Sequence, residues 1–238
     1  MNHIRLKQLL FIDIETVPIQ ANYESLPSAM QKLFANKIKH YKTDLTIEEL
    51  YTQKAGILAE FGKIVCIGLG YLAGKRDNYQ MRVTAVANEN EKVLLKAFLK
   101  LLNKSFNNVN QFCFCGHNIK EFDIPYICRR ILINALPLPE VLNISGLKPW
   151  EVNHVDTLNL WKFGDRKHYT SVSLLAHLLK VPTPKSDIDG SDVATVYWEQ
   201  NDLERIIRYC KKDVIAVAQL IMRFKQLPLL KEEQIIVL

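Results

Sequence analysis

The sequence has few cysteines, and they form none of the patterns that disulfide frameworks or zinc sites use. There are five, with no Cys-x-x-Cys pair, and a zinc site would need further Cys or His residues at ligand spacing. The odd count and the apolar neighbours of these cysteines indicate buried, reduced thiols, which are typical of the cytosol. We therefore expect a cytoplasmic location.

Long apolar runs are also lacking. No run is long enough to span a membrane, and Met1 to Lys7 are polar and show no signal peptide. Repeats, low-complexity tracts and linkers between domains are missing too. The 238 residues, 48% hydrophobic and 24% charged, suffice for a sizeable core. We expect one globular domain over residues 1–238 and no membrane partner.

Acidic residues are outnumbered by basic ones. The 31 Lys and Arg residues against 25 Asp and Glu residues give a formal net charge of +6, with an isoelectric point of about 9.0. This balance suits a polyanionic partner such as nucleic acid. The excess is modest, so charge alone does not identify the partner.

The hydrophobic pattern predicts a mixed α/β fold. Two β-rich runs, 63–72 and 80–87, flank a turn over 74–78 and predict an antiparallel hairpin. Gly68 and Gly70 do not make a dinucleotide-binding fingerprint, because a strand rather than a helix follows them. Further strands are expected at 9–16, 112–116 and 152–157, and helices at 88–102, 122–136, 171–180, 193–200 and 202–224. In the helix over 171–180, four leucines are expected to face inward: Leu174, Leu175, Leu178 and Leu179.

This order of elements predicts the architecture and the place of a site. A strand, a hairpin and then alternating helices and strands give a mixed sheet with an antiparallel hairpin at its edge and helices on its faces. In such sheets, ligands gather at the carboxyl ends of the parallel strands.

Residues 17–60 form a polar, charged segment without an evident core strand. Thr46 and Glu49 fit a capping box, so helices are expected here. We interpret the segment as a mostly helical insertion or lid beside the end of the first strand. A peripheral segment without function would show the same pattern.

Two acidic residues interrupt the first strand. Side chains alternate along a strand, so Asp13 and Glu15 share one side. Two carboxylates at a rigid strand end can hold a hard cation such as Mg²⁺. Two solvated acids at a strand end would give the same pattern, so the interpretation depends on partners elsewhere in the chain.

Candidate partners follow a later strand and lie in the last long helix. Asn118 and Asp123 lie close to Asp13 if the two strands are neighbours, although Asp123 alone also fits an acid favoured at a helix N-terminus. Tyr209 and Asp213 are four residues apart and share one helix face. That face is otherwise apolar and should pack inward, so a buried Asp213 needs a cation or another partner.

In this order, the three segments resemble the exonuclease motifs of the DEDD (DnaQ-like) 3′–5′ exonucleases, in the tyrosine (DEDDy) subtype. The motifs correspond to residues 11–16, 117–123 and 209–213. Within that superfamily the chain is most similar to stand-alone proteins related to the proofreading domain of family-B DNA polymerases, over most of its length. The resemblance implies a ribonuclease H-like fold with helices on both faces of the sheet. We expect no polymerase domain in this chain.

The resemblance also implies two Mg²⁺ or Mn²⁺ ions held by four carboxylates. Asp13 would bridge both ions. Glu15 and Asp213 would hold the ion that activates water, and Asp123 would support the other. Tyr209 would orient the attacking water, because a phenol with a reference pKa near 10 is a poor base at neutral pH. The implied reaction is hydrolysis at the 3′ end of single-stranded nucleic acid, DNA rather than RNA, with release of nucleoside 5′-monophosphates.

Further residues would contact the substrate by the same resemblance. Thr16, Asn118 and Phe122 would touch the terminal nucleotides, with Phe122 stacking on a base or only packing in the core. Lys185 could meet a phosphate. Asp156, just after a strand, fits a helix cap better than a fifth metal ligand. Three alternatives remain: a non-catalytic nucleic-acid-binding module, an RNA-directed 3′–5′ exoribonuclease, and an α/β interaction domain whose motifs are accidental.

Overall fold

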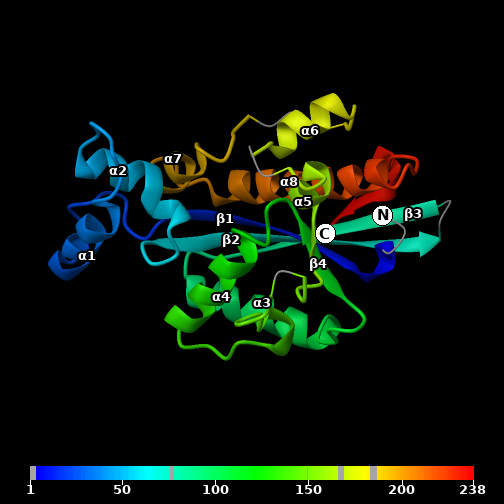
Figure 1. Ribbon diagram of the computed structural model, residues 1–238, viewed down its shortest axis with the longest axis horizontal. Coiled ribbons are helices and arrows are strands. Elements are labelled where there is room, and N and C mark those ends of the chain that lie inside the picture. The colour runs from blue at the N-terminus through cyan, green and yellow to red at the C-terminus, as the bar shows by residue number, and fades with distance from the viewer. Residues whose placement is uncertain (1–3, 76–77, 149, 166–168, 183–186) are drawn as a thin grey trace.

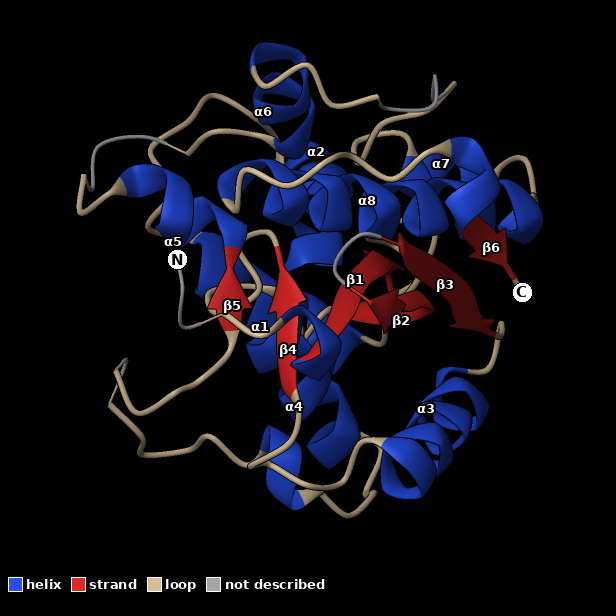
Figure 2. Cartoon of the chain, turned by 90° about the vertical axis from the view of Figure 1, so that its right-hand side faces the viewer, coloured by secondary structure: helices blue, strands red, loops and turns tan. Residues whose placement is uncertain are grey.

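Six strands form one mixed sheet at the centre of the structure, a computed structural model that describes residues 4–75, 78–148, 150–165, 169–182 and 187–238. The strand order is β5-β4-β1-β2-β3-β6, and Figure 2 shows the strands in this order. Their bounds are β1 (Leu9–Pro18), β2 (Gly62–Lys75), β3 (Asn78–Ala87), β4 (Cys113–Gly116), β5 (Val155–Asp156) and β6 (Ile235–Val237).

The pairing of the strands confirms the predicted hairpin and parallel strands. Antiparallel pairing joins β1 to β2 and β2 to β3. Parallel pairing joins β1 to β4, β4 to β5 and β3 to β6. The strand β6 was not predicted. It covers the free edge of β3, so the hairpin is not at the edge of the sheet.

Helices cover both faces of the sheet, as expected (Figures 1 and 2). The long α8 crosses one face with α5, α6 and α7 beside it, whereas α3 and α4 cover the other face. None of the described helices combines the length and apolar character needed to cross a membrane. The bounds are α1 (Ser28–Ile38), α2 (Ile47–Lys54), α3 (Glu91–Ser105), α4 (Asp123–Ile133), α5 (Thr157–Lys162), α6 (Val172–Leu178), α7 (Val193–Trp198) and α8 (Leu203–Phe224).

The strand β1 contributes to the apolar cores on both faces of the sheet. Ile12 and Ile14 pack with residues of α3 and α4 in one core. Phe11 packs with residues of α8 in the other. Because side chains alternate along a strand, Asp13 and Glu15 point to the same face as Phe11, the face that α8 covers.

A buried ion pair holds α4 to the sheet. The Glu91 carboxylate accepts hydrogen bonds from Nε of Arg130 at 2.8 Å and from the backbone N–H of Ile64 in β2 at 2.7 Å. Arg130 also donates to the carbonyl of Ala59 at 2.8 Å. Both charged residues are buried. Since α4 begins at Asp123, this network fixes the helix that carries one of the predicted metal ligands.

The insertion over 17–60 contains α1 and α2, which lie beyond the end of β1 in Figure 1. Thr46 and Glu49 form the predicted capping box at the start of α2. Phe34 and Tyr51 of the segment pack with Phe61, which follows it, in a small apolar cluster. The two helices are therefore packed elements and not a loose excursion of the chain.

The prediction for the leucines of α6 is partly wrong. Leu175 is fully buried, but Leu174 and Leu178 are 48% and 54% exposed, and Leu179 is only partly buried. The short helix packs one narrow side against α8 near Leu220, so only the leucine at the centre of that side is enclosed.

Candidate active site

A cleft of about 830 Å³ opens where β1 and β4 end. Its walls come from β1, from the loop that follows β4, from the start of α4, from α8 and from the segment over 17–60. Every predicted site residue that the structure describes lines this cleft: Asp13, Glu15, Thr16, Asn118, Phe122, Asp123, Tyr209 and Asp213. Lys185 lies outside the described residues.

The two carboxylates of β1 face the cleft from beneath α8. Asp13 is half-buried and Glu15 is only 6% exposed. The pairing of β1 with β2 shifts register between Glu15 and Thr16. Such an irregularity bends a strand locally, here directly after the second carboxylate, and the pairing with β2 then continues from Thr16 to Pro18.

Asp123 approaches the same strand from the other side of the sheet. It is the first residue of α4 and is 4% exposed. Its Oδ1 accepts a hydrogen bond from the backbone N–H of Ile14 at 3.2 Å. The structure therefore places this carboxylate next to the strand segment between Asp13 and Glu15.

The helix α8 brings two predicted residues to the cleft and one unpredicted, buried residue against Asp13. The Tyr209 hydroxyl and the Asp213 carboxylate, one helical turn apart, interact with each other. The thiol of Cys210 lies 3.5 Å from both the backbone oxygen and Oδ2 of Asp13. This contact joins α8 to β1 at the base of the cleft.

Burial raises the pKa of all four carboxyl groups, and this loss of solvent is the largest cause in each case. Repulsion from Asp213 and Asp123 raises the pKa of Asp13 further, and repulsion from Asp13 and Asp213 does so for Glu15. The pKa of Asp123 is raised to about 7 and that of Asp213 to about 6. The cluster thus binds protons unusually well for carboxylates.

The same arrangement fits divalent cations. None of the ion pairs among the described residues includes any of these four carboxylates. Carboxylate oxygens are the ligands that Mg²⁺ and Mn²⁺ prefer. A cation would offset the cost of gathering buried negative charges. The residues that could hold such ions are Asp13, Glu15, Asp123 and Asp213.

Tyr209 can donate a hydrogen bond in the cleft but cannot act as a base there. Burial and the nearby carboxylates, Asp213 first, raise the pKa of its hydroxyl. The phenol therefore stays protonated at every physiological pH. Its interaction with Asp213 lowers the pKa of that carboxyl group, which favours the charged form needed to bind a cation.

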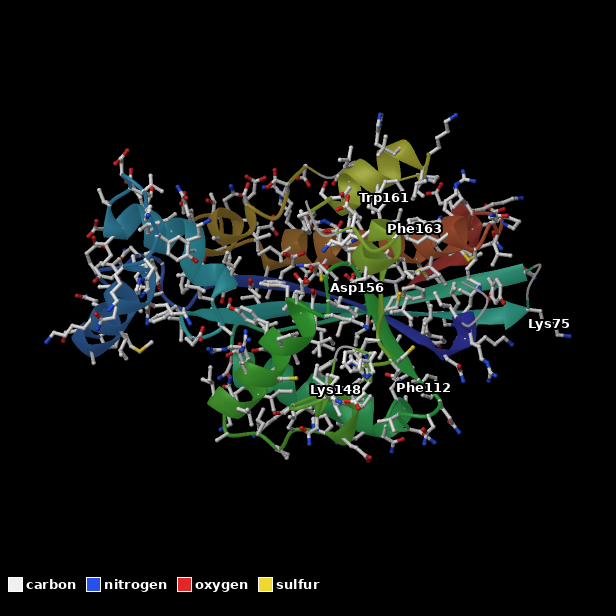
Figure 3. All side chains as sticks on the ribbon, viewed as in Figure 1. Lys75, Phe112, Lys148, Asp156, Trp161 and Phe163 are labelled. Carbon is white, nitrogen blue, oxygen red and sulfur yellow. The ribbon has the colours of Figure 1, made fainter. Side chains whose placement is uncertain are left out.

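Asp156 shapes the loop that carries Asn118. Its carboxylate accepts from the N–H groups of Asn118 at 3.0 Å and Lys120 at 3.1 Å, and caps α5 through the N–H of Leu158 at 2.9 Å. Figure 3 labels Asp156 where β5 meets α5. Asn118 has a φ of 62°, a left-handed conformation that Asn tolerates. The predicted capping role of Asp156 is confirmed.

Tyr169, an aromatic residue that lines the cleft, was not singled out from the sequence. The ring of Tyr169 packs edge-on against that of His117, with centroids 5.7 Å apart. Nδ1 of His117 lies 2.9 Å from Oγ1 of Thr157, and Nε2 lies 2.7 Å from the carbonyl oxygen of Thr170. These contacts fix the imidazole ring as a support for Tyr169. No spacing in the sequence connects Tyr169 with the distant carboxylates.

The insertion also contributes to the cleft. Thr52, Gln53 and Lys54 at the end of α2, with Gly56 and Ile57 in the turn that follows, form part of its wall. The side chain of Lys54 is the kind of group that meets a phosphate. The segment therefore takes part in the geometry of the candidate site.

Comparison with known proteins gives a family match and a similar fold. Residues 57–232 match the family described as predicted 3′–5′ exonucleases related to the exonuclease domain of PolB. The fold is similar to that of a family B DNA polymerase from the hyperthermophilic archaeon Pyrobaculum calidifontis, with a TM-score of 0.55 and 13% identity over 90% of this chain. The similarity covers 24% of the polymerase chain. A comparison with curated proteins found no match.

These findings define the class and then the family. The mixed sheet, with helices on both faces and a carboxylate-lined cleft at its strand ends, has the ribonuclease H-like fold of the polymerase's exonuclease region. The chain belongs to the family of predicted 3′–5′ exonucleases related to the PolB exonuclease domain. The matched residues include Asp123, Tyr209 and Asp213, and begin after the first motif.

Proposed function

We propose that the protein is a metal-dependent 3′–5′ exonuclease of the tyrosine subtype. Its substrate is single-stranded nucleic acid, DNA rather than RNA, and its products are nucleoside 5′-monophosphates. The observation that carries this proposal is the convergence of four carboxylates from β1, α4 and α8 in one cleft. Membership of a family of predicted exonucleases supports a nuclease activity. The basic isoelectric point suits a polyanionic substrate.

The four carboxylates have distinct proposed roles. Two Mg²⁺ or Mn²⁺ ions, when bound, would acidify the attacking water and neutralise charge on the scissile phosphate. Asp13 is proposed to hold both ions, because it interacts with the carboxylates of Asp213, Asp123 and Glu15. Glu15 and Asp213 are proposed to share one ion, and Asp123 to support the other.

Tyr209 is proposed to orient the attacking water. In the reaction, the attacking water gives up one proton to solvent and its oxygen forms a bond to phosphorus. The bond from phosphorus to the 3′ oxygen breaks, and this leaving oxygen takes up a proton from solvent. The Tyr209 hydroxyl stays protonated and lies beside Asp213, so it can fix the direction of a water molecule without removing its proton. Positioning of this kind lowers the entropic part of the barrier.

Thr16, Asn118 and Phe122 are proposed to contact the terminal nucleotides. All three line the cleft, whose volume of about 830 Å³ lies in the range of small-molecule sites. The Phe122 ring is backed by Tyr126, with centroids 5.4 Å apart, and so presents a fixed surface on which a base can stack. Lys185 is proposed to meet a phosphate.

The test is digestion of single-stranded DNA labelled at its 5′ end, with and without Mn²⁺. We expect a ladder of labelled products that shorten from the 3′ end, with a duplex of the same sequence resisting unless it frays. Asp13→Asn, which keeps the shape of the side chain but not its charge, should lose nearly all activity. Early release of a labelled mononucleotide would contradict the polarity, and digestion by a folded Asp13→Asn variant would sink the metal assignment. RNA of the same sequence tests the preference for DNA.

A further inference from the structure

A thiol lies directly behind the two carboxylates of β1. Cys210 is fully buried, and its sulfur is in contact with Asp13. One ligand atom from each of Asp13, Glu15 and Cys210 lies within 4.8 Å of the other two. Among the described residues, this is the group of Cys, His, Asp and Glu side chains close enough to share one metal ion. The sequence analysis, which looked for zinc ligands at fixed spacing, missed it.

Glu15 provides a second, independent observation. Its side chain is more than nine-tenths buried and lines the cleft. In the described part of the chain, no ion pair reaches its carboxylate. A buried carboxylate in this setting is stabilised by a cation, and the cleft gives a cation access to it from solvent.

We propose that Asp13, Glu15 and Cys210 form a binding site for a thiophilic divalent cation of the Zn²⁺ and Cd²⁺ class. Thiolates favour such ions, whereas Mg²⁺ has little use for sulfur. On binding, the Cys210 thiol releases its proton to solvent and the sulfur forms a bond to the cation, with no change of oxidation state. Ligands of one tetrahedral zinc lie roughly 3.5 Å apart, so only a small contraction of the three atoms is required.

The consequence for activity rests on the proposed function. A thiophilic cation at this site occupies Asp13, the carboxylate proposed to hold both catalytic ions. It should therefore inhibit the nuclease even in a large excess of Mg²⁺, because the thiolate gives it a bond that Mg²⁺ does not match. Binding itself does not depend on the nuclease function.

Any test must distinguish the thiol of Cys66 from the thiol of Cys210. Cys66 is fully buried, its side chain interacts with that of Cys210, and it pairs with Glu15 across the β1–β2 ladder. Cys113, by contrast, lies on β4 outside the lining of the cleft. Cys113→Ser is therefore a control for a free cysteine elsewhere, and Cys66→Ser tests whether the neighbouring thiol is a further ligand.

The experiment is a titration of the metal-free full chain with Cd²⁺, followed by the ultraviolet charge-transfer absorption of a cadmium–thiolate bond. Wild type and Cys113→Ser should show one equivalent of binding, which excess Mg²⁺ displaces only partly. Cys210→Ser should lose the absorption and weaken Cd²⁺ binding by about 10-fold or more. Absorption that is unchanged in Cys210→Ser, or absent from wild type, would overturn the proposal.

Two further measurements keep the test decisive. Thermal unfolding without metal checks that Cys210→Ser and Cys210→Ala remain folded. If neither folds, the ¹¹³Cd resonance of the wild-type complex decides, because a shift typical of oxygen ligands alone contradicts the proposal. A chain that binds Cd²⁺ through Cys210 but does not digest DNA with Mn²⁺ would sink the proposed function and keep this site. An active nuclease without the cadmium–thiolate absorption would do the reverse.

Discussion

Oδ1 of Asp123 lies 3.2 Å from the backbone nitrogen of Ile14, which donates a hydrogen bond to it although the two residues are 109 positions apart. Ile14 lies between Asp13 and Glu15 in β1. The bond therefore ties the first residue of α4 to the strand that carries the other carboxylates. Asp123 both joins two elements and adds a negative charge to the cleft, and substitution can separate these two roles.

Asp123→Asn should remove the negative charge but keep the hydrogen bond that joins α4 to β1. The amide oxygen can still accept from Ile14, and loss of a buried charge relieves repulsion, so the metal-free melting temperature should stay the same or rise. Asp123→Ala leaves the Ile14 N–H without its acceptor and should cost about 1–3 kcal/mol. Both variants should lose at least about 10-fold to 100-fold in Mn²⁺-dependent digestion. An Asn variant as unstable as the Ala variant would show that the charge itself holds α4.

The raised pKa values predict that acid stabilises the metal-free protein. A carboxyl group with a folded-state pKa above its unfolded value, near 4, stabilises the fold fully below that value, and the effect is lost as pH rises through the folded-state pKa. For Asp213 and Asp123 these values are about 6 and about 7. The carboxylate contribution to the free energy of unfolding should therefore fall between pH 4 and pH 7.

Protonation of His154 has the opposite effect on stability, so its contribution must be removed from the measurement. Within the described part of the chain, neither of its buried ring nitrogens has a hydrogen-bond partner, and burial lowers its pKa to about 4. Its contribution is present above about pH 6.5 and is lost as pH falls toward 4. Urea unfolding of wild type and of Asp123→Asn is compared at each pH. Because both proteins contain His154, its contribution cancels from the difference between their free energies of unfolding. The pH dependence of the difference should vanish in saturating Mn²⁺, which replaces the protons. If the free energies of unfolding of the two proteins change with pH in parallel without metal, the raised pKa of Asp123 is contradicted.

The parts of the site that the sequence predicted depend on local periodicity. Asp13 and Glu15 share a face because a strand alternates, and Tyr209 and Asp213 share a face because a helix repeats every three to four residues. Each rule holds within one element. The order of the motifs along the chain then predicted that the motifs come together, because parallel strands end at the same edge of a sheet.

The parts that were missed depend on packing between elements. Cys210 meets Asp13 only because α8 crosses β1, and Tyr169 lines the cleft only because the chain before α6 passes His117. The strand β6 has three residues, too few to show alternation, and it forms because β3 offers a free edge. The exposed Leu174 of α6 belongs to a pattern that looks amphipathic, but α8 covers only one narrow side of that short helix.

Asp156 should support activity without binding metal. Asp156→Ala removes the acceptor for the N–H groups of Asn118 and Lys120 and the cap of α5, and should cost about 2–4 kcal/mol of stability. Displacement of Asn118 should raise KM for single-stranded DNA. Asp156→Asn keeps one acceptor and should fall between wild type and the Ala variant. Calorimetric titration with Mn²⁺ should give unchanged affinity for both folded variants, and a large loss would make Asp156 a ligand after all.

Tyr209→Phe and Asp213→Asn compare two changes one helical turn apart. Asp213 is a proposed metal ligand, so Asp213→Asn should weaken Mn²⁺ binding and abolish digestion together. Tyr209→Phe keeps the ring and its packing and removes only the hydroxyl, so stability should change little. The turnover rate should still fall by about 10-fold to 1,000-fold, the span of a mispositioned catalytic group.

The pH of the comparison matters because the Tyr209 hydroxyl also lowers the pKa of Asp213. Without it, the Asp213 carboxyl group takes up a proton more readily, and near pH 6 the Phe variant would lose metal as well as water orientation. At pH 8, well above the pKa of about 6 that this carboxyl group has in the wild type, the lost hydroxyl has its smallest effect on protonation. The Phe variant should there bind Mn²⁺ and DNA as wild type does and be slow only at saturating substrate. If Tyr209→Phe turns over at the full rate at pH 8 while Asp213→Asn is inactive, the proposed metal site is kept. Tyr209 then does not orient the attacking water.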